Sequence, residues 1–290
     1  MLMALPAILW FIVFAYLPMG GLVLAFKTFN YNDGIFGSPW SGLENFRFLY
    51  QSGTLLRLTV NTILFNMAFL ITSIVLQITA AVFLSEMAGK WFKKIAQSVM
   101  FLPYFVSYVL LAALIYNLFN YENGVLNSLL ASLNLPRIDI YGTPSLWKYI
   151  LVFFYNWKWV GYGMVVYLAA IMAISQEYYE AARIDGAGML QKIRYITLPM
   201  MMPTIMVIFL LNVGQIMRGQ FELFYQIVGD NGMLFEATDI IDTYVFRSLV
   251  KSFDIGMGSA AGLYQSAFGL VLVLAVNALV KWRNKDYSLF

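Results

Sequence analysis

Long apolar runs alternate along the chain with polar connections. Six of these runs are long enough to cross the hydrocarbon core of a bilayer, which takes about 20 helical residues. Lys158 is the one charged residue inside any of them. The pattern predicts an all-α, polytopic integral membrane protein whose six helices span residues 4–26, 60–84, 99–119, 149–174, 200–217 and 259–280.

Proline residues interrupt three of these predicted helices, at Pro6, Pro18, Pro103 and Pro203. Such breaks are tolerated in a bilayer because neighbouring helices can satisfy the freed backbone groups. The first run exceeds the roughly 7–15-residue apolar region of a signal peptide and lacks its basic flank. We therefore expect it to remain as a membrane helix, and the missing flank suggests that the natural chain starts upstream of Met1.

The composition agrees with a protein whose main solvent is lipid. Of the 290 residues, 61% are hydrophobic and only 11% are charged, whereas a soluble domain carries about 25% charged residues. The chain contains no cysteine and no histidine, which excludes disulfides, metal sites with thiolate or imidazole ligands, and nucleophiles activated by histidine. We expect neither a catalytic residue nor a metal site. The net charge of +3 is too small to indicate a nucleic acid partner.

The basic residues predict the orientation of the chain in the membrane. With six spans, the connections 85–98 and 175–199 and the C-terminal segment lie on one side, and they hold a denser set of basic residues, by about twofold, than the other side. The positive-inside rule places this denser side, with the C-terminus, in the cytoplasm. Its basic residues are Lys90, Lys93, Lys94, Arg183, Lys192, Arg194, Lys281, Arg283 and Lys285.

No internal repeat or low-complexity linker divides the sequence, so we expect a single transmembrane domain, residues 1–290. The outer connection 218–258 is too long for a passive loop. It contains an amphipathic stretch, 240–250, that predicts a short helix at the membrane surface.

The cytoplasmic connection 175–199 carries the most specific pattern in the chain. A helix-forming stretch with Glu177 and Glu180 in its early turns leads to Gly186, which can break the helix and turn the chain. Beyond it, apolar residues recur at helical spacing up to Pro199, a residue suited to the first turn of the next membrane helix. We predict two short helices joined by a glycine elbow, the second parallel to the membrane, in a shape that fits a cleft on a cytoplasmic partner.

The segment EAARIDGAGMLQKIRYITLP resembles the EAA loop of membrane subunits of binding-protein-dependent ABC importers. Further stretches are similar to the maltose-type sugar permease superfamily, in its polysaccharide or oligosaccharide permease branch. They are FKTFNYNDGIFGSPWSGLENFRFL, DTYVFRSLVKSFDIGMGSAAGLYQSAFGLVLVLAVNALVKW and the terminal Tyr287–Phe290. The anchor positions of the loop, which the resemblance assigns to ATPase coupling, are Glu180, Ala181, Ala182, Gly186, Ile196, Leu198 and Pro199.

This resemblance implies a type I ABC importer permease fold and a set of partners. A second, homologous permease would complete a heterodimer in the lipid of a bacterial plasma membrane. Two ATPase subunits would bind the coupling loops and hold ATP and Mg, and an extracellular or lipoprotein receptor would deliver the sugar. The sequence contains no Gly-x-x-x-x-Gly-Lys-Ser/Thr run, so we expect no cofactor in this chain and no ATP hydrolysis by it.

Aromatic and polar residues at helical spacing are candidates for the sugar pathway. Tyr155, Trp159 and Tyr162 lie at i, i+4 and i+7, and flat rings can stack on the apolar faces of pyranoses. Lys158 lies on nearly the same face, and a buried charge is expected to face a cavity or another helix. Asn212 and Gln215, at i and i+3, can bond to sugar hydroxyls.

Alternatives remain open for both the residues and the function. The aromatic residues fit an interfacial belt in which Lys158 extends to the membrane surface, and the two amides fit helix-to-helix contacts. An autonomous secondary transporter or channel is a second class, although no carboxylate lies in a predicted span. A non-sugar solute is a rival cargo for an ABC permease. The identity, length and linkage of the sugar and the identity of the receptor stay open.

Overall fold

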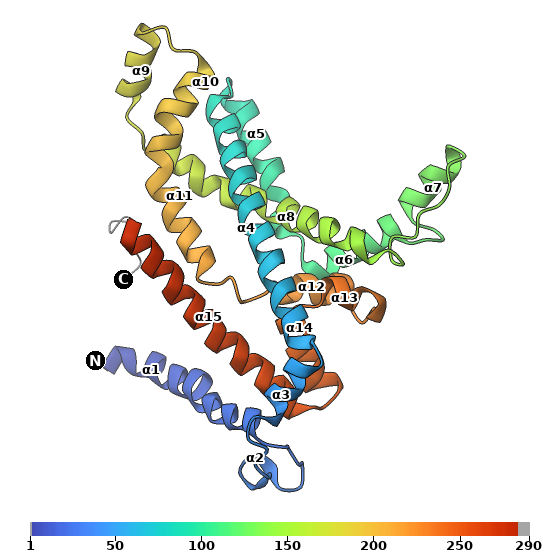
Figure 1. Ribbon diagram of the computed structural model, residues 1–290. Coiled ribbons are helices and arrows are strands. Elements are labelled where there is room, and N and C mark those ends of the chain that lie inside the picture. Colours follow the sequence, from blue (N-terminus) through green and yellow to red (C-terminus); the bar gives the residue numbers. More distant parts are fainter. Residues whose placement is uncertain (1, 284–290) are drawn as a thin grey trace. The chain divides into compact units, whose positions relative to one another are not determined.

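The computed structural model describes residues 2–283, and all of the longer regular elements in this range are helices (Figure 1). The described residues divide into two compact units. Unit 1 comprises residues 2–62, Met217–Phe221 and Asp239–Val271, and unit 2 comprises Ile63–Ile216, Glu222–Thr238 and residues 272–283. The predicted single transmembrane domain stays a prediction. Tyr287–Phe290 and Lys285 lie outside the described residues.

Among residues 2–283, four helical segments are long and apolar enough to cross a membrane by themselves, and the number is six if each of two bent pairs counts as one span. The four are Leu5–Phe26, Thr54–Glu86 (α4), Met189–Val213 and Ile255–Trp282, the last within α15 (Ile255–Arg283). Leu5–Phe26 consists of α1 (Leu5–Phe11), a π-helical turn η2 (Ile12–Tyr16) and a 3-10 stretch η3 (Leu17–Phe26). The predicted spans 4–26, 60–84, 200–217 and 259–280 correspond to these segments.

The predicted span 99–119 is wrong as a single helix. It is divided between α5 (Lys90–Phe101), a 3-10 turn η4 (Leu102–Phe105) and α6 (Tyr108–Phe119), with a bend of 95°. Pro103 in η4 has no N–H to continue the helix. Val106 and Ser107 are extended, and the Ser107 hydroxyl then accepts a hydrogen bond from the Leu110 N–H to start α6.

The predicted span 149–174 corresponds to α8 (Pro144–Met172), which begins five residues earlier because Pro144 starts the helix. A bend of 69° separates α8 from the short α9 (Gln176–Ile184). The predicted helix at 240–250 is present as α14 (Ile241–Phe246) and a π-helical turn η7 (Arg247–Lys251), and its place at the membrane surface stays a prediction. The remaining elements are η1 (Leu2–Ala4), α2 (Gly34–Gly37), α3 (Glu44–Gln51), α7 (Val125–Ser132), α10 (Met189–Lys192), η5 (Ile193–Thr197), α11 (Leu198–Val213), α12 (Phe221–Val228), η6 (Gly232–Leu234) and α13 (Phe235–Thr238).

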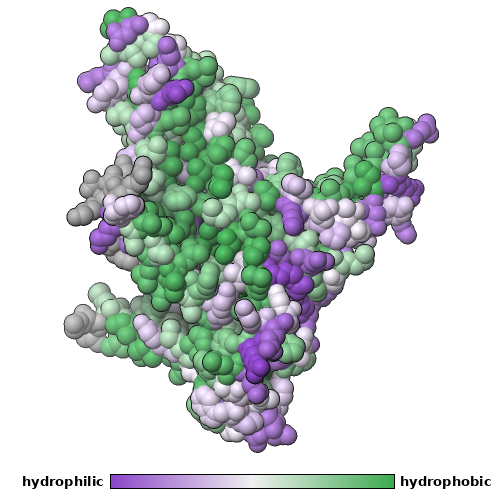
Figure 2. Space-filling view, in the orientation of Figure 1, coloured by the Kyte–Doolittle hydropathy of each residue, from purple (hydrophilic) through white to green (hydrophobic). Residues whose placement is uncertain are grey.

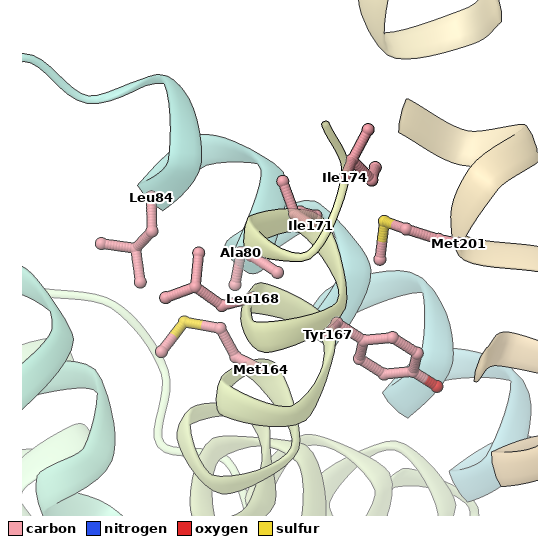
Figure 3. Close-up of a cluster of buried hydrophobic side chains, with 9 residues drawn as sticks. Ala80, Leu84, Met164, Tyr167, Leu168, Ile171, Ile174 and Met201 are labelled. Carbon is pink, nitrogen blue, oxygen red and sulfur yellow. The ribbon is translucent and has the colours of Figure 1, made fainter. Parts of the chain in front are cut away.

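Each unit has its own buried core. In unit 1, Ala25 and Leu49 pack with Ala260 and Ala261 of α15. In the core of unit 2, side chains of α4 and α11 pack against those of α8 (Figure 3). Its buried members are Ala80, Ala81, Leu84, Met164, Tyr167, Leu168, Ile171, Ile174 and Met201.

Many apolar side chains lie on the surface rather than in these cores. Figure 2 shows hydrophobic residues over much of the visible face. Exposed large apolar side chains of the molecule include Val75 of α4, Leu211 of α11 and Val271 of α15. Soluble monomers rarely expose such extended apolar surface. The acyl chains of a bilayer are the environment that this surface fits.

Candidate functional site

The connection between α8 and α11 contains the short helix α9, whose two ends are capped by hydrogen bonds, and a sharp turn after it. The hydroxyl of Ser175 accepts a hydrogen bond from the Glu177 N–H and caps the start of α9. At the other end, the Ala187 N–H donates to the Ala182 carbonyl (2.8 Å) and the Gly186 N–H donates to the Arg183 carbonyl (3.1 Å). This pair of bonds is the Schellman arrangement, which needs a left-handed residue after the helix. Gly186, with φ of +77°, is that residue.

The predicted elbow is confirmed, but the predicted separate second helix is wrong. After Gly188 the chain continues as α10, η5 and α11 in one helical run, Met189–Val213. Pro199 is the second residue of α11. The π-helical turn η5 directly before it widens the backbone, which relieves the clash that a proline ring makes with the preceding turn.

The coupling segment, residues 176–199, has an exposed apolar tip around Ile184 and Leu190. At its base, a hydrogen bond joins Tyr179 to Thr197. Ile184 is 87% exposed and Leu190 is 81% exposed, although both are large apolar side chains. The Tyr179 hydroxyl and the Thr197 hydroxyl lie 3.0 Å apart and join α9 to the end of η5, directly before α11. The tip is therefore accessible while its base is held in one geometry.

The seven predicted anchor positions divide between this tip and its base. Glu180, Ala181, Gly186 and Pro199 are exposed, whereas Ala182, Ile196 and Leu198 are half-buried. Ile196 packs against the core of unit 2. Glu180, Ala181 and Gly186 are therefore accessible to a partner, and Ile196 attaches the segment to the membrane helices. Their role in ATPase coupling stays a prediction.

The predicted aromatic residues of α8 contact rings from the bend between α5 and α6 and from α4. Tyr155 stacks on Phe69 of α4, with ring centroids 4.1 Å apart. Tyr162 stacks on Tyr104 of η4 at 4.7 Å. The Trp159 indole N–H donates to the Tyr108 hydroxyl at 2.9 Å. The rings therefore form one cluster.

Lys158 points into the bend between η4 and α6. The side chain is only 6% exposed, so the alternative in which it extends to the membrane surface is wrong. Its ammonium group donates to the carbonyls of Tyr104, at 2.8 Å, and Val106. The same nitrogen lies 5.7 Å and 5.1 Å from the ring centres of Tyr104 and Tyr108. Carbonyl dipoles and aromatic faces therefore surround the charge.

The two predicted amides do not join this cluster through any hydrogen bond recorded among residues 2–283. Asn212 is exposed and donates to the Ile208 carbonyl of its own helix (2.8 Å). Gln215 lies beyond the end of α11 at Val213, in a turn, so its expected helical position is wrong. Their contact with a sugar, like that of the aromatic residues and Lys158, stays a prediction.

Sequence reasoning missed the partners of this cluster, Phe69, Tyr104 and Tyr108. The available signal was the proline at position 103 next to a group of aromatic residues in the same apolar run. A proline in a membrane helix leaves backbone groups unpaired, and those groups need a partner. That signal indicates a break without indicating which residue binds there.

Comparison with known proteins decides the family. Residues 77–285 match the family described as the binding-protein-dependent transport system inner membrane component. The chain belongs to this family. It is 32% identical over 280 residues to the polygalacturonan/rhamnogalacturonan transport system permease protein YteP of Bacillus subtilis (strain 168), an alignment that covers 97% of this chain and 87% of that protein.

Solved structures agree with this membership. A bacterial ABC transporter involved in the import of the acidic polysaccharide alginate contains a chain with a TM-score of 0.88 and 33% identity, covering 97% of this chain and 94% of that one. A bacterial alginate ABC transporter in complex with alginate pentasaccharide-bound periplasmic protein gives a TM-score of 0.87 at 32% identity, with coverage of 98% and 94%.

Membership in this family confirms the predicted ABC importer permease fold and the multi-pass membrane location. The chain is a transport component of a binding-protein-dependent system. A free-standing secondary transporter or channel is therefore not its class. The matched range contains the whole coupling segment and the whole of α8.

Proposed function

We propose that this chain forms half of the translocation pathway of an ATP-driven importer for oligosaccharides derived from an acidic polysaccharide. The named cargo of similar proteins supports the substrate class, since these proteins transport polygalacturonan, rhamnogalacturonan or alginate. A soluble or lipid-anchored receptor outside the cell selects the sugar and delivers it, and the permease then gives it a passage.

The exposed tip of the coupling segment is the observation that carries this proposal. An apolar surface such as Ile184 and Leu190 is costly in water on a segment that polar residues keep outside the lipid. A cleft on a cytoplasmic ATPase subunit buries it. Because the Schellman closure and the bond between Tyr179 and Thr197 fix the segment, movement of the ATPase can pass to α8 and α11.

The remaining partners follow from the same proposal. A second, homologous permease completes the pathway, and two ATPase subunits bind ATP and Mg and perform the hydrolysis. This chain itself is non-catalytic. Its coupling segment and C-terminus lie in the cytoplasm, in agreement with the distribution of lysine and arginine.

The pathway in this chain passes the aromatic cluster of α8. Ring faces of Tyr155, Trp159 and Tyr162 supply apolar surface to sugar rings, and the Tyr hydroxyls supply polar contacts. The amides of Asn212 and Gln215 are further candidates for bonds to sugar hydroxyls. Such contacts are shallow and unspecific, which suits a pathway whose cargo the receptor has already selected.

The coupling role of residues 176–199 can be tested at two nearby glycines, Gly186 and Gly188, that differ in backbone conformation. Gly186→Pro is incompatible with φ of +77° and removes the N–H that bonds to the Arg183 carbonyl. Gly188→Ala is the matched control, because Gly188 has φ of −70° and an added Cβ would lie no closer than 3.8 Å to the Gln191 side chain. We expect Gly186→Pro to insert and assemble but to lose receptor-stimulated ATP hydrolysis and uptake in proteoliposomes, while Gly188→Ala keeps both. Normal uptake with Gly186→Pro would refute the coupling role.

A further inference from the structure

The bend between η4 and α6 exposes backbone carbonyls inside a membrane-spanning segment. In a continuous helix, the carbonyls of Tyr104 and Val106 would accept N–H groups from the next turn. Here the helix stops at Phe105 and restarts at Tyr108. At membrane depth such freed carbonyls need a partner, either a donor within the protein or water in a cavity. A donor from another element would therefore stabilise the bend.

Lys158 supplies those donors from α8. Its ammonium group bonds to one carbonyl within η4 and one after it, Tyr104 and Val106. Burial of an ammonium is costly unless it is hydrogen-bonded, and the two carbonyls with the rings of Tyr104 and Tyr108 meet that requirement. The free carbonyls at the break thus gain donors, and the buried ammonium gains acceptors.

One short stretch of α8, residues 158–162, holds the rings on both sides of the break. Tyr162 stacks on Tyr104, which belongs to η4, with an angle of 16° between the rings. Trp159 bonds to the hydroxyl of Tyr108, the first residue of α6. Lys158 contacts the backbone between these two rings. Loss of its bonds would free α6 to move against η4 and would separate the rings of Tyr104 and Tyr108.

We propose that Lys158 is a positioning residue that holds the bend between η4 and α6, and that it does not bind the carboxylate of the cargo. The aromatic platform that it holds consists of Tyr104, Tyr108, Trp159 and Tyr162. This assignment rests on the proposed transport of acidic oligosaccharides. A lysine in such a pathway invites the interpretation of a carboxylate site, but its ammonium is committed to two backbone carbonyls. The platform therefore recognises sugar rings rather than charge.

The cysteine-free chain allows the bend to be measured directly. Ile95→Cys on α5 and Leu110→Cys on α6 are exposed positions for a pair of spin labels. Their distance distribution would be recorded by pulsed electron paramagnetic resonance in the assembled importer with its partner permease, ATPases and receptor. Lys158→Met removes the donors at similar length, Lys158→Arg keeps a charged donor, and Lys148→Met is a matched control for an exposed lysine on the same helix.

We expect Lys158→Met to broaden the distance distribution, while Lys158→Arg and Lys148→Met leave it close to that of the unsubstituted chain. Uptake would be measured with an acidic oligosaccharide and with the same compound after chemical reduction of its carboxyl groups. Lys158→Met should lower both by the same factor, about tenfold, the loss expected when a hydrogen bond from a charged group is removed. Lys158→Arg should restore uptake of both.

Two results would overturn the proposal. One is an unchanged distance distribution in Lys158→Met. The other is a loss confined to the acidic compound, which would make Lys158 a carboxylate site. If Lys158→Met fails to assemble, Lys158→Gln carries the same measurements: its shorter, neutral amide loses at least one of the two carbonyls, so the distance distribution should again broaden, and an unchanged distribution would overturn the proposal. If the unsubstituted importer moves neither compound, the proposed cargo is wrong, whereas the distance measurement still tests the bend.

Discussion

A methyl group added at Gly161 should separate α8 from α5. An ideal Cβ at this position would lie 1.9 Å from the carbonyl oxygen of Met100, 2.5 Å from its carbonyl carbon and 2.8 Å from the Cα of Phe101. All three are backbone atoms, so no side-chain rotation can relieve the overlap. Gly161→Ala can be accommodated only if α5 moves away from α8 just before the bend.

The expected loss of stability in Gly161→Ala follows from the cost of overpacking, which is about 1–3 kcal/mol for an extra methylene group in a packed core. For a chain of this size, each kcal/mol changes the melting temperature by roughly 2–4 °C. We therefore expect Gly161→Ala to lower the melting temperature of the purified complex by about 2–12 °C. Uptake should fall as well, because a displaced α5 carries η4 and Tyr104 with it.

Gly163→Ala and Gly20→Ala are the controls for this measurement. A Cβ at Gly163 would meet the amide end of the Gln77 side chain, which can turn away, and a Cβ at Gly20 would meet nothing within 4 Å. Thermal unfolding in detergent, followed by the loss of the monodisperse species, should rank Gly161→Ala below both. Equal melting temperatures for Gly161→Ala and Gly163→Ala would show that the close approach of α5 and α8 is not a constraint.

Two further predictions concern buried polar groups. The Tyr167 hydroxyl is buried and has no hydrogen-bond partner among the described residues. Tyr167→Phe should therefore keep the free energy of unfolding or raise it by up to about 1–3 kcal/mol, which gives an unchanged or higher melting temperature. A marked fall in melting temperature would reveal a partner of this hydroxyl in the assembly. Burial raises the pKa of Asp242, although the Gly219 N–H and the Gln265 amide donate to its carboxylate. Because the folded state then holds this proton more tightly than the unfolded state, the contribution of Asp242 to stability falls as the pH rises from its ordinary pKa through the raised value. Across that pH range, the melting temperature of the unsubstituted chain should therefore contain a fall with rising pH that is missing in Asp242→Asn.

The coupling segment could be predicted from the sequence because its geometry is local. The bonds that close α9 join residues only three and five positions apart, and Gly186 provides the backbone conformation that they need. The continuous helix after Gly188 could not be predicted in the same way. Pro199 favours a helix start, and its tolerance within a longer run depends on the π-helical turn before it.

Hydrophobic runs located the spans, but they did not show which proline breaks a helix. Pro203 lies inside α11 without interrupting it, whereas Pro103 coincides with a bend of 95°. Both residues lack the same N–H. The difference arises from what lies nearby in space. Ser107 restarts the helix, and the carbonyls freed at the break have a donor on α8, about fifty residues away in the sequence.

The aromatic spacing on α8 predicted a shared face, and the cost of burying a charge predicted that Lys158 needs a compensating environment. Neither argument identified that environment, because the sequence left a cavity, another helix and the membrane surface open. The structure shows another helix, and that helix is broken. It presents carbonyls without helical partners, and at membrane depth such groups need a donor from the protein or water in a cavity. An intramembrane lysine and an intramembrane proline break therefore gain from being paired with each other, and in this chain Lys158 bonds to the carbonyls that the break near Pro103 leaves free. Two features that each look unfavourable alone in the sequence become one stable contact in the fold.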